Sequence, residues 1–527
     1  MPRGEGFVRQ STRLILNTGL TYLRMAVTVG MGLLATRLAL QALGVTDFGA
    51  WGAVLAVVMF IGVIPDGLLQ AADRYLGVAI GRGERGPLRA LFSTMVAIFC
   101  VAAPIAVLVG LPLGRLAVGG IKDLDPARVS SIVLAFDLGL LMLGFSIAMT
   151  PFRAMFGAQQ ALLWPVITEL IDGTLKLAAA AFCAQVAQEP IVGLAALTLA
   201  AQTTSTGIAV VMCLVIYPES RPKLGLAKRH LVRELTRFSV WSLVGNLSYR
   251  IQVGGPPLLI SSAFGAAANA PFNAAAQLAN YMLNVSNAVV RAVQPAMANA
   301  EGRQDRAAIA KLAISASKFC TLLPLTLLVP LVIEADLVTR VWLGSHSPPD
   351  VALFVRLVAV GFCIGCIYVG HHLAMMAHGS IGRYMTGALL FQAGGLCVSA
   401  GLVFLFHVPS WAVPAMSCLT TFCAVNWYVW HICKTVGLRY ADWWSGVWYR
   451  VALVAVPAGL AGLGARLLLP EGLGRAIAVG GVYGLVSLPL IIKLGMTSEE
   501  RGHFARLGSK IPVLGRFIPS GQPAAQA

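Results

Sequence analysis

The sequence predicts an all-α polytopic membrane protein, and three observations carry that prediction. The 527 residues are 57% hydrophobic and 12% charged, with a mean hydropathy of +0.78, whereas a soluble domain carries about 25% charged residues. Apolar runs of about 20 residues, long enough to cross a bilayer as a helix, recur along the chain. The polar breaks between these runs are alternately rich and poor in Lys and Arg, a pattern that sets the orientation of membrane proteins.

Fourteen apolar runs are expected to form transmembrane helices, and their even number places both termini on one side. In chain order they cover residues 14–38, 48–75, 88–111, 128–150, 162–184, 190–216, 236–263, 271–298, 310–333, 351–377, 384–406, 410–433, 447–468 and 474–494.

The orientation follows from the basic residues of alternate loops. The rich loops lie at about 3–13, 82–89, 221–237, 303–311, 434–439 and 501–516. The opposite loops hold little beyond Arg115, Lys122, Arg128, Arg340, Arg466 and Arg475. Because basic loops stay in the cytoplasm, both termini are predicted inside, in a bacterial inner membrane. The net charge of +17 has this topological explanation, and no nucleic-acid partner is implied.

A repeat divides the chain into two halves. The loops "GRGER" (81–85) and "GRQDR" (302–306) are 221 residues apart, and the same offset relates Gly44 to Gly265 and Asp66 to Asn287. We therefore predict two six-helix pseudo-symmetric lobes, at about 1–220 and 230–440. Two extra C-terminal helices at 445–495 and a disordered cytoplasmic tail at 496–527 follow. Parallel repeats of this kind are typical of transporters, with the substrate site between the repeats.

Polar side chains recur at helical spacing in the first two spans of each half. The four sets are Asn17, Thr21, Arg24 and Thr28; Asp66, Gln70, Asp73 and Arg74; Ser242, Asn246, Tyr249 and Arg250; and Asn273, Gln277, Asn280, Asn284, Asn287 and Arg291. Each set falls on one helix face. An ionised side chain at the bilayer centre costs at least ~2.5–3.5 kcal/mol, so these faces are expected to line a shared cavity.

The predicted cavity is positively charged and suits an anionic substrate. Its predicted substrate-binding residues are Arg24, Asp66, Gln70, Arg74, Asn246, Arg250, Asn280, Asn284, Asn287 and Arg291. Arginine offers paired donors to phosphate. For a single Asn or Thr, hydrogen bonding that only holds helices together is the competing explanation. Pro65 and the run Gly254–Pro257 are expected to interrupt their helices and to let them bend.

Other polar groups in the apolar runs have a structural explanation or none. Glu169, Asp172 and Lys176 form a charge-neutral set at helical spacing, which favours a structural cluster. Asp137 and Arg356 are isolated charges, and a functional role for them and for Lys176 stays open. Cys363 and Cys366 form a C-x-x-C motif near two histidines, but a metal site normally needs a second ligand pair. No metal or cofactor is expected.

Two stretches of each half resemble bacterial polysaccharide-biosynthesis flippases, within the multidrug/oligosaccharidyl-lipid/polysaccharide exporter superfamily. These are "TRLALQALGVTDFGAWGAV" (36–54) with "IPDGLLQAADRYLGVAIGRGE" (64–84), and "FGAAANAPFNAAAQLANYM" (264–282) with "QPAMANAEGRQDR" (294–306). The resemblance covers the first twelve spans, and the last two resemble an addition found in some members, including lipid II flippases. Asn-Ala-Pro-Phe departs from the family's turn, and Gly245 matches Arg24 at the repeat offset.

The resemblance implies that the protein is no enzyme. It implies movement of an undecaprenyl-pyrophosphate-linked oligosaccharide or polysaccharide repeat unit, as in O-antigen and lipopolysaccharide synthesis, by alternating access across the inner membrane. Polysaccharide polymerase machinery is an implied partner, and coupling to protons or sodium stays open. A cation-coupled multidrug antiporter of the same superfamily is the alternative, kept open by Asp66. A polytopic polymerase or ligase is disfavoured because the outward loops are short, the longest at about 110–128 and 334–350.

Overall fold

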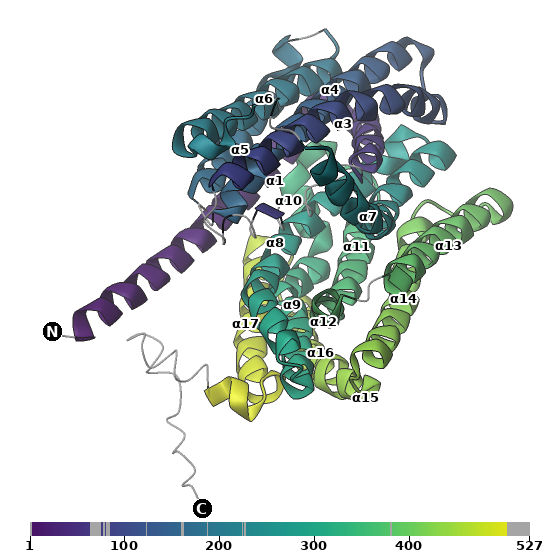
Figure 1. Cartoon of the computed structure of the whole chain (residues 1–527). Coiled ribbons are helices and arrows are strands. Elements are labelled where there is room, and N and C mark those ends of the chain that lie inside the picture. Colours follow the sequence, from purple (N-terminus) through teal and green to yellow (C-terminus); the bar gives the residue numbers. More distant parts are fainter. Residues whose placement is uncertain are drawn as a thin grey trace, which may run out of the picture. The chain divides into compact units, whose positions relative to one another are not determined.

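The structure is a computed structural model in which every regular element is a helix over the described residues (Figure 1). The described residues are 3–63, 75–76, 80, 85–122, 124–159, 163–186, 188–223, 225, 228–379 and 382–502. Within them, the side chains of 3–26, 85–87, 163, 229–230, 234, 236–242, 284 and 295 are not described.

The helices group into two compact units, which we describe separately. Unit 1 comprises Met1–Asn284, Thr339–Phe362 and Ser380–Tyr428, and unit 2 comprises Val285–Val338, Cys363–Gly379 and Val429–Ala527. The first helices are α1 (Arg3–Ile61), α3 (Arg85–Gly119), α4 (Pro126–Ala158), α5 (Leu163–Val186), α6 (Pro190–Ile216), α7 (Arg229–Phe264) and α8 (Ala266–Gly302). They are followed by α9 (Arg306–Ile333), α10 (Ala335–Leu343), α11 (Val351–Cys366), α12 (Val369–His378), α13 (Gly382–Phe406), α14 (Ala412–Val436), α15 (Tyr440–Trp443), α16 (Tyr449–Leu468) and α17 (Leu473–Leu490).

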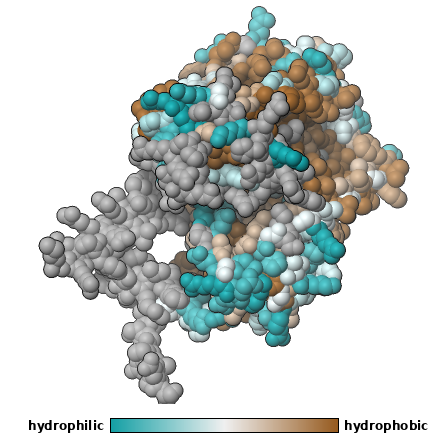
Figure 2. Space-filling model, in the orientation of Figure 1, coloured by the Kyte–Doolittle hydropathy of each residue, from teal (hydrophilic) through white to brown (hydrophobic). Residues whose placement is uncertain are grey.

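The prediction of an all-α membrane protein is confirmed. Each apolar run overlaps a helix where it is described, although the second run can be followed only to Ile61. In the described part of the chain, nine helices are long and apolar enough to cross a membrane, or ten if α11 and α12, bent by 41°, form one span. Figure 2 shows wide apolar patches on the visible surface, and Leu467 and Leu485 are 84% and 77% exposed. The count of fourteen and the orientation of the termini stay predictions.

Two glycines at the repeat offset break the helices in the same way. Gly44 lies inside α1 with φ 74° and ψ 175°, and Gly265 separates α7 from α8 with φ 89° and ψ 170°. Side chains other than glycine avoid this backbone region because the Cβ atom clashes there. The offset of 221 residues therefore relates two turns of equal geometry, while the lobe boundaries at 220, 230, 440 and 445 stay predictions.

The helix that follows Gly44 packs against the start of α8, the helix that follows Gly265. The amide nitrogens of Asn269 and Asn273 donate to the carbonyls of Gly49 (3.0 Å) and Phe48 (3.1 Å). A Cβ atom on Gly52 would lie 2.8 Å from Asn273 and 3.1 Å from Asn269. Because Phe48 and Gly52 correspond to Asn269 and Asn273 at the offset, the contact of 48 with 273 has its counterpart in that of 52 with 269. This reciprocity is typical of a two-fold relationship.

The run Gly254–Pro257 does not interrupt its helix, contrary to the expectation, because α7 continues through both prolines to Phe264. The two glycines instead permit close packing inside unit 1. A Cβ atom on Gly254 would lie 2.8 Å from the ring of Phe60, and one on Gly255 would lie 2.8 Å from Leu396. The absence of side chains is thus used for helix contacts, and the prolines are tolerated within the packed helix. Pro65 lies outside the described residues.

In unit 2, the hairpin of α16 and α17 packs along α9 and is joined to it by ion pairs near both ends. After the end of α9, Arg475 pairs with Glu334 at 2.8 Å and Arg466 with Asp336 at 3.4 Å. In the first half of α9, Lys318 pairs with Glu500 at 2.5 Å, and its side chain has 0% exposure. The two extra helices are therefore held against α9 at both ends.

The predicted disordered tail does not begin at residue 496. The described residues 496–502 form an ordered segment, in which the carboxylate of Glu500 accepts hydrogen bonds from Lys318, Ser315 and the backbone N–H of Thr497. Lys311 adds an exposed pair with Glu499 at 3.0 Å. Residues 503–527 lie outside the described residues.

Candidate functional site

The polar stripe of α8 divides into a packing part and an exposed part. Asn273 is buried and its amide nitrogen is engaged by the carbonyl of Phe48. Further along the helix, Gln277 is half-buried, while Asn280, Asn287 and Arg291 are exposed. The exposed residues are spaced by seven and four, which places them on one helix face. This part of the stripe is free of helix packing and available to a ligand.

The stripe of α7 lies in unit 1 and is also partly buried. Asn246 and Arg250, four residues apart, are half-buried, and Tyr249 is 44% exposed. The amide nitrogen of Asn246 is buried and has no hydrogen-bond partner. Between Glu234 and Glu301 the chain contains two arginines, Arg250 and Arg291, and no carboxylate. The inner helices of the second half therefore carry amides and cations only.

The remaining predicted site residues cannot be placed. Asp66, Gln70 and Arg74, as well as the side chains of Arg24 and Asn284, lie outside the described residues. The convergence of the four stripes on one cavity stays a prediction for this reason.

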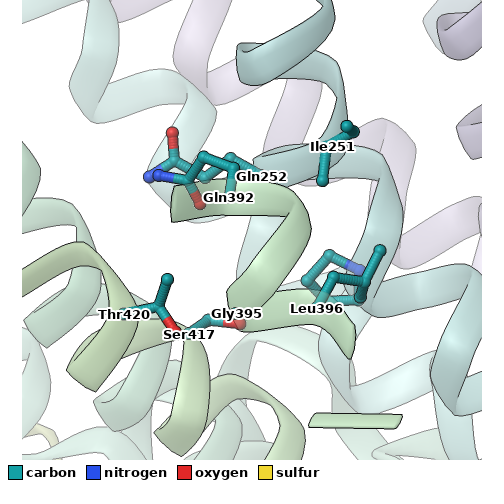
Figure 3. A pocket seen from close by; sticks show the side chains of 8 residues that line it. Ile251, Gln252, Gln392, Gly395, Leu396, Ser417 and Thr420 are labelled. Carbon is teal, nitrogen blue, oxygen red and sulfur yellow. The ribbon is translucent and has the colours of Figure 1, made fainter. Parts of the chain in front are cut away.

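A small polar pocket, which the sequence analysis did not identify, lies in unit 1 between α7, α13 and α14 (Figure 3). It is lined by Ile251, Gln252, Pro256, Gln392, Gly395, Leu396, Ser417 and Thr420. Pro256 has no N–H group, so it donates no hydrogen bond to the carbonyl of Gln252 one turn earlier. Two amides, two hydroxyls and this carbonyl make the pocket neutral and rich in hydrogen-bonding groups.

Two other intramembrane polar groups have different surroundings. Lys176 pairs with Asp172 at 2.7 Å and donates to Gln202 at 3.1 Å, while Ser205 donates to Asp172 at 3.1 Å. This network on α5 and α6 confirms the prediction of a charge-neutral cluster. On α4, one carboxylate oxygen of Asp137 is buried without a hydrogen-bond partner.

The comparisons with known proteins agree on the class of protein. Residues 165–348 match the model of a family described as polysaccharide biosynthesis protein. An inward-facing multidrug-resistance transporter of the MATE family, in the MOP superfamily, has a TM-score of 0.68 at 13% identity, over 79% of this chain and 98% of its own. The lipid II flippase MurJ, in an inward closed conformation, has a TM-score of 0.67 at 11% identity, over 92% and 100%.

A third structure, a MOP-superfamily transporter from Pyrococcus furiosus, has a TM-score of 0.59 at 13% identity, over 79% of this chain and 95% of its own. No curated protein sequence matches the chain. The fold is that of the MOP superfamily of membrane transporters and flippases. Within that class, the family match and the structural neighbours confirm the resemblance to polysaccharide-biosynthesis flippases.

Proposed function

We propose that the protein is a flippase that moves an undecaprenyl-pyrophosphate-linked oligosaccharide or polysaccharide repeat unit across the bacterial inner membrane. One observation carries the proposal: Arg250 and Arg291 accompany amides, without a carboxylate, on two inner helices inside the segment that matches the polysaccharide-biosynthesis family. The lipid II flippase also aligns with 92% of this chain, against 79% for the MATE transporter.

The side chains of the stripes divide by chemistry into two roles. Arg24, Arg74, Arg250 and Arg291 bind the pyrophosphate, because a guanidinium group makes two parallel hydrogen bonds to phosphate oxygens. Gln70, Asn246, Asn280, Asn284 and Asn287 bind the hydroxyl groups of the glycan, because amides both donate and accept hydrogen bonds. The lipid tail remains in the bilayer while the two lobes alternate between inward and outward openings around the bound headgroup.

Asp66 has a separate role in this proposal. It pairs with one of the cavity arginines when no substrate is bound, and the incoming pyrophosphate replaces it. The carboxylate thus restores the empty site after release and keeps the arginine from retaining the product.

The second candidate is a cation-coupled multidrug antiporter, which the similarity to the MATE transporter favours. Such a protein needs a membrane carboxylate that binds the drug or its coupling ion. Asp66 and the buried carboxylate of Asp137 are the groups that would serve.

Arg291 offers the most direct test because its side chain is exposed on α8. The variants Arg291→Ala and Arg291→Lys are reconstituted in vesicles with an undecaprenyl-pyrophosphate-linked glycan, and the transfer of its sugar to the protected leaflet is measured. We expect Arg291→Ala to lose more than about ten-fold in rate and Arg291→Lys to retain part of it, since an ammonium group lacks the paired donors.

The matched control is Arg303→Ala, which removes an exposed cation beyond the end of α8 and is expected to flip at the wild-type rate. An Arg291→Ala protein that flips as fast as the wild type would show that this arginine does not bind the substrate.

A further inference from the structure

The connection between α6 and α7, residues 217–228, is fixed to the beginning of α3 by hydrogen bonds. The backbone N–H groups of Lys223 and Lys228 donate to the hydroxyls of Ser93 (3.0 Å) and Thr94 (3.1 Å). Arg89 donates to the carbonyl of Arg221 at 3.1 Å. Ser93 and Thr94 are buried, at 3% and 0% exposure. The connection is therefore held in one place although it lies outside the helices.

The hydrogen bonds use the backbone of the two lysines and leave their side chains exposed. Lys223, Lys228 and Arg221 are all exposed, and Glu219 is the acid among the described residues of the connection. Arg89 at the start of α3, Arg153 near the end of α4 and Arg233 in α7 add positive charge on the adjoining helices. The fixed connection thus presents a cluster of cations with little opposing charge.

The cluster lies where the apolar surface of unit 1 ends. Val211 and Val215, one turn apart on α6, are 55% and 66% exposed, as is typical of a lipid-facing helix surface. The next residue outside α6 is Tyr217, whose ring packs against Phe156 with centroids 5.9 Å apart. An aromatic ring between an apolar surface and a cationic one is typical of the headgroup level of a bilayer.

We propose that the α6–α7 connection is a binding surface for anionic phospholipid headgroups. Basic clusters directly beside a membrane-spanning helix attract the negatively charged leaflet. Because hydrogen bonds to α3 have already fixed the backbone, the lysines lose little additional freedom when they bind the headgroups. In the predicted orientation these headgroups belong to the cytoplasmic leaflet, and the contact fixes the depth of α3, α6 and α7 in the bilayer.

A basic loop also orients a chain during insertion, and the two roles make different predictions for the folded protein. A role confined to insertion predicts no lipid preference once the protein is purified. A headgroup surface predicts preferential binding of phosphatidylglycerol over phosphatidylethanolamine, which weakens with salt because the screening length falls from about 10 Å at 0.1 M to about 3 Å at 1 M.

The test compares the wild type with a Lys223→Gln/Lys228→Gln double variant, which keeps both backbone hydrogen bonds to α3. The matched control, Arg115→Gln/Lys122→Gln, removes two exposed cations from the other end of α3 and beyond it, so its net charge changes equally. Each protein is placed in vesicles of mixed phosphatidylglycerol and phosphatidylethanolamine, and the relative association of the two lipids is measured by fluorescence quenching with brominated lipids.

We expect the Lys223→Gln/Lys228→Gln protein to lose the preference for phosphatidylglycerol by at least about five-fold, and the control to keep it. High salt should remove the preference of the wild type. Equal preference in the wild type and the double variant, an equal loss in the control, or no preference in the wild type would each overturn the proposal.

Discussion

Gly44 and Gly265 adopt nearly the same backbone conformation although they are 221 residues apart, with φ of 74° and 89° and ψ of 175° and 170°. Their surroundings differ. A Cβ atom on Gly44 would meet no atom within 4 Å, whereas one on Gly265 would lie 3.0 Å from the carbonyl oxygen of Lys122. The same backbone geometry is therefore combined with free space in one half and with a close contact in the other.

Alanine at either glycine should destabilise the protein, and more at Gly265. A residue with a Cβ atom in this backbone region costs about 1–3 kcal/mol, and Gly265→Ala also pushes against Lys122. We expect both variants to unfold at lower temperature than the wild type in detergent, in the order Gly265→Ala below Gly44→Ala. Gly207→Ala, inside α6 with open space around it, is the control and should unfold at or above the wild-type temperature. Equal unfolding temperatures for Gly265→Ala and Gly207→Ala would contradict the assignment.

The pair of Lys318 and Glu500 should be the costliest charge contact of the C-terminal hairpin to break. Glu500→Gln leaves Lys318 buried without its counter-charge, which costs about 3–5 kcal/mol when a buried pair loses one member. Adding Lys318→Met should recover part of this loss. A double-mutant cycle on the free energy of unfolding measures the coupling, and Glu499→Gln, in the exposed pair with Lys311, should cost less than about 1 kcal/mol.

The contribution of Glu500 should also depend on pH. Burial alone would raise the pKa of its carboxyl group, but hydrogen bonds from Lys318 and Ser315 hold this pKa below its ordinary value. A carboxyl group whose pKa is lowered by folding contributes stability above its unfolded pKa of about 4.3, and this contribution is lost as the pH falls through the folded pKa. The difference in unfolding temperature between wild type and Glu500→Gln should therefore be constant from about pH 8 to 6 and shrink in acid.

The predicted orientation can be tested with reporters. A fusion after Arg229 or Arg506 should report a cytoplasmic position, and insertions near Lys122 or His346 should report a periplasmic one, because the basic loops remain inside. A periplasmic result at Arg506 would show that the extra helices do not both cross the membrane in the predicted direction.

Asp66 should distinguish the flippase from the antiporter. In a flippase, Asp66→Asn should impair glycan export and leave the sensitivity of cells to cationic dyes unchanged. In an antiporter, overexpression of the wild type should confer dye resistance, and Asp66→Asn should abolish it. Dye efflux and glycan export are measured in the same cells at matched protein abundance. Strong efflux that depends on Asp66 would refute the flippase proposal.

The helices could be predicted from the sequence because apolar runs of membrane length are a direct requirement of the bilayer. The turn at Gly44 and Gly265 was accessible through the repeat offset. The continuous path of α7 through Gly254–Pro257 was not, because glycine and proline act as breakers only when no neighbouring helix needs the space. Phe60 and Leu396, which occupy that space, are distant in sequence.

The candidate site was predictable only in part. Periodicity placed Asn280, Asn287 and Arg291 on one exposed face of α8, but it assigned Asn273 to the same stripe without indicating that Asn273 is committed to helix packing. The neutral pocket was missed because its polar groups come from three helices. Its signal was present as Ser417, Thr420 and Thr421 at helical spacing in α14, and Gln252 donates to Thr421 at 3.3 Å.

The contact between the segments after Gly44 and Gly265 limits how the duplicated halves can be exchanged. Asparagine amides in the second half satisfy carbonyls of the first, and the first half offers glycine where the second has Asn273. A gene that repeated the first half twice would place Phe48 and Gly52 where the amides are needed, and those carbonyls would lose their donors. A gene that repeated the second half would set one Asn273 against another in a space that admits no Cβ atom. The two copies have become obligate complements, and neither can now serve as its own partner.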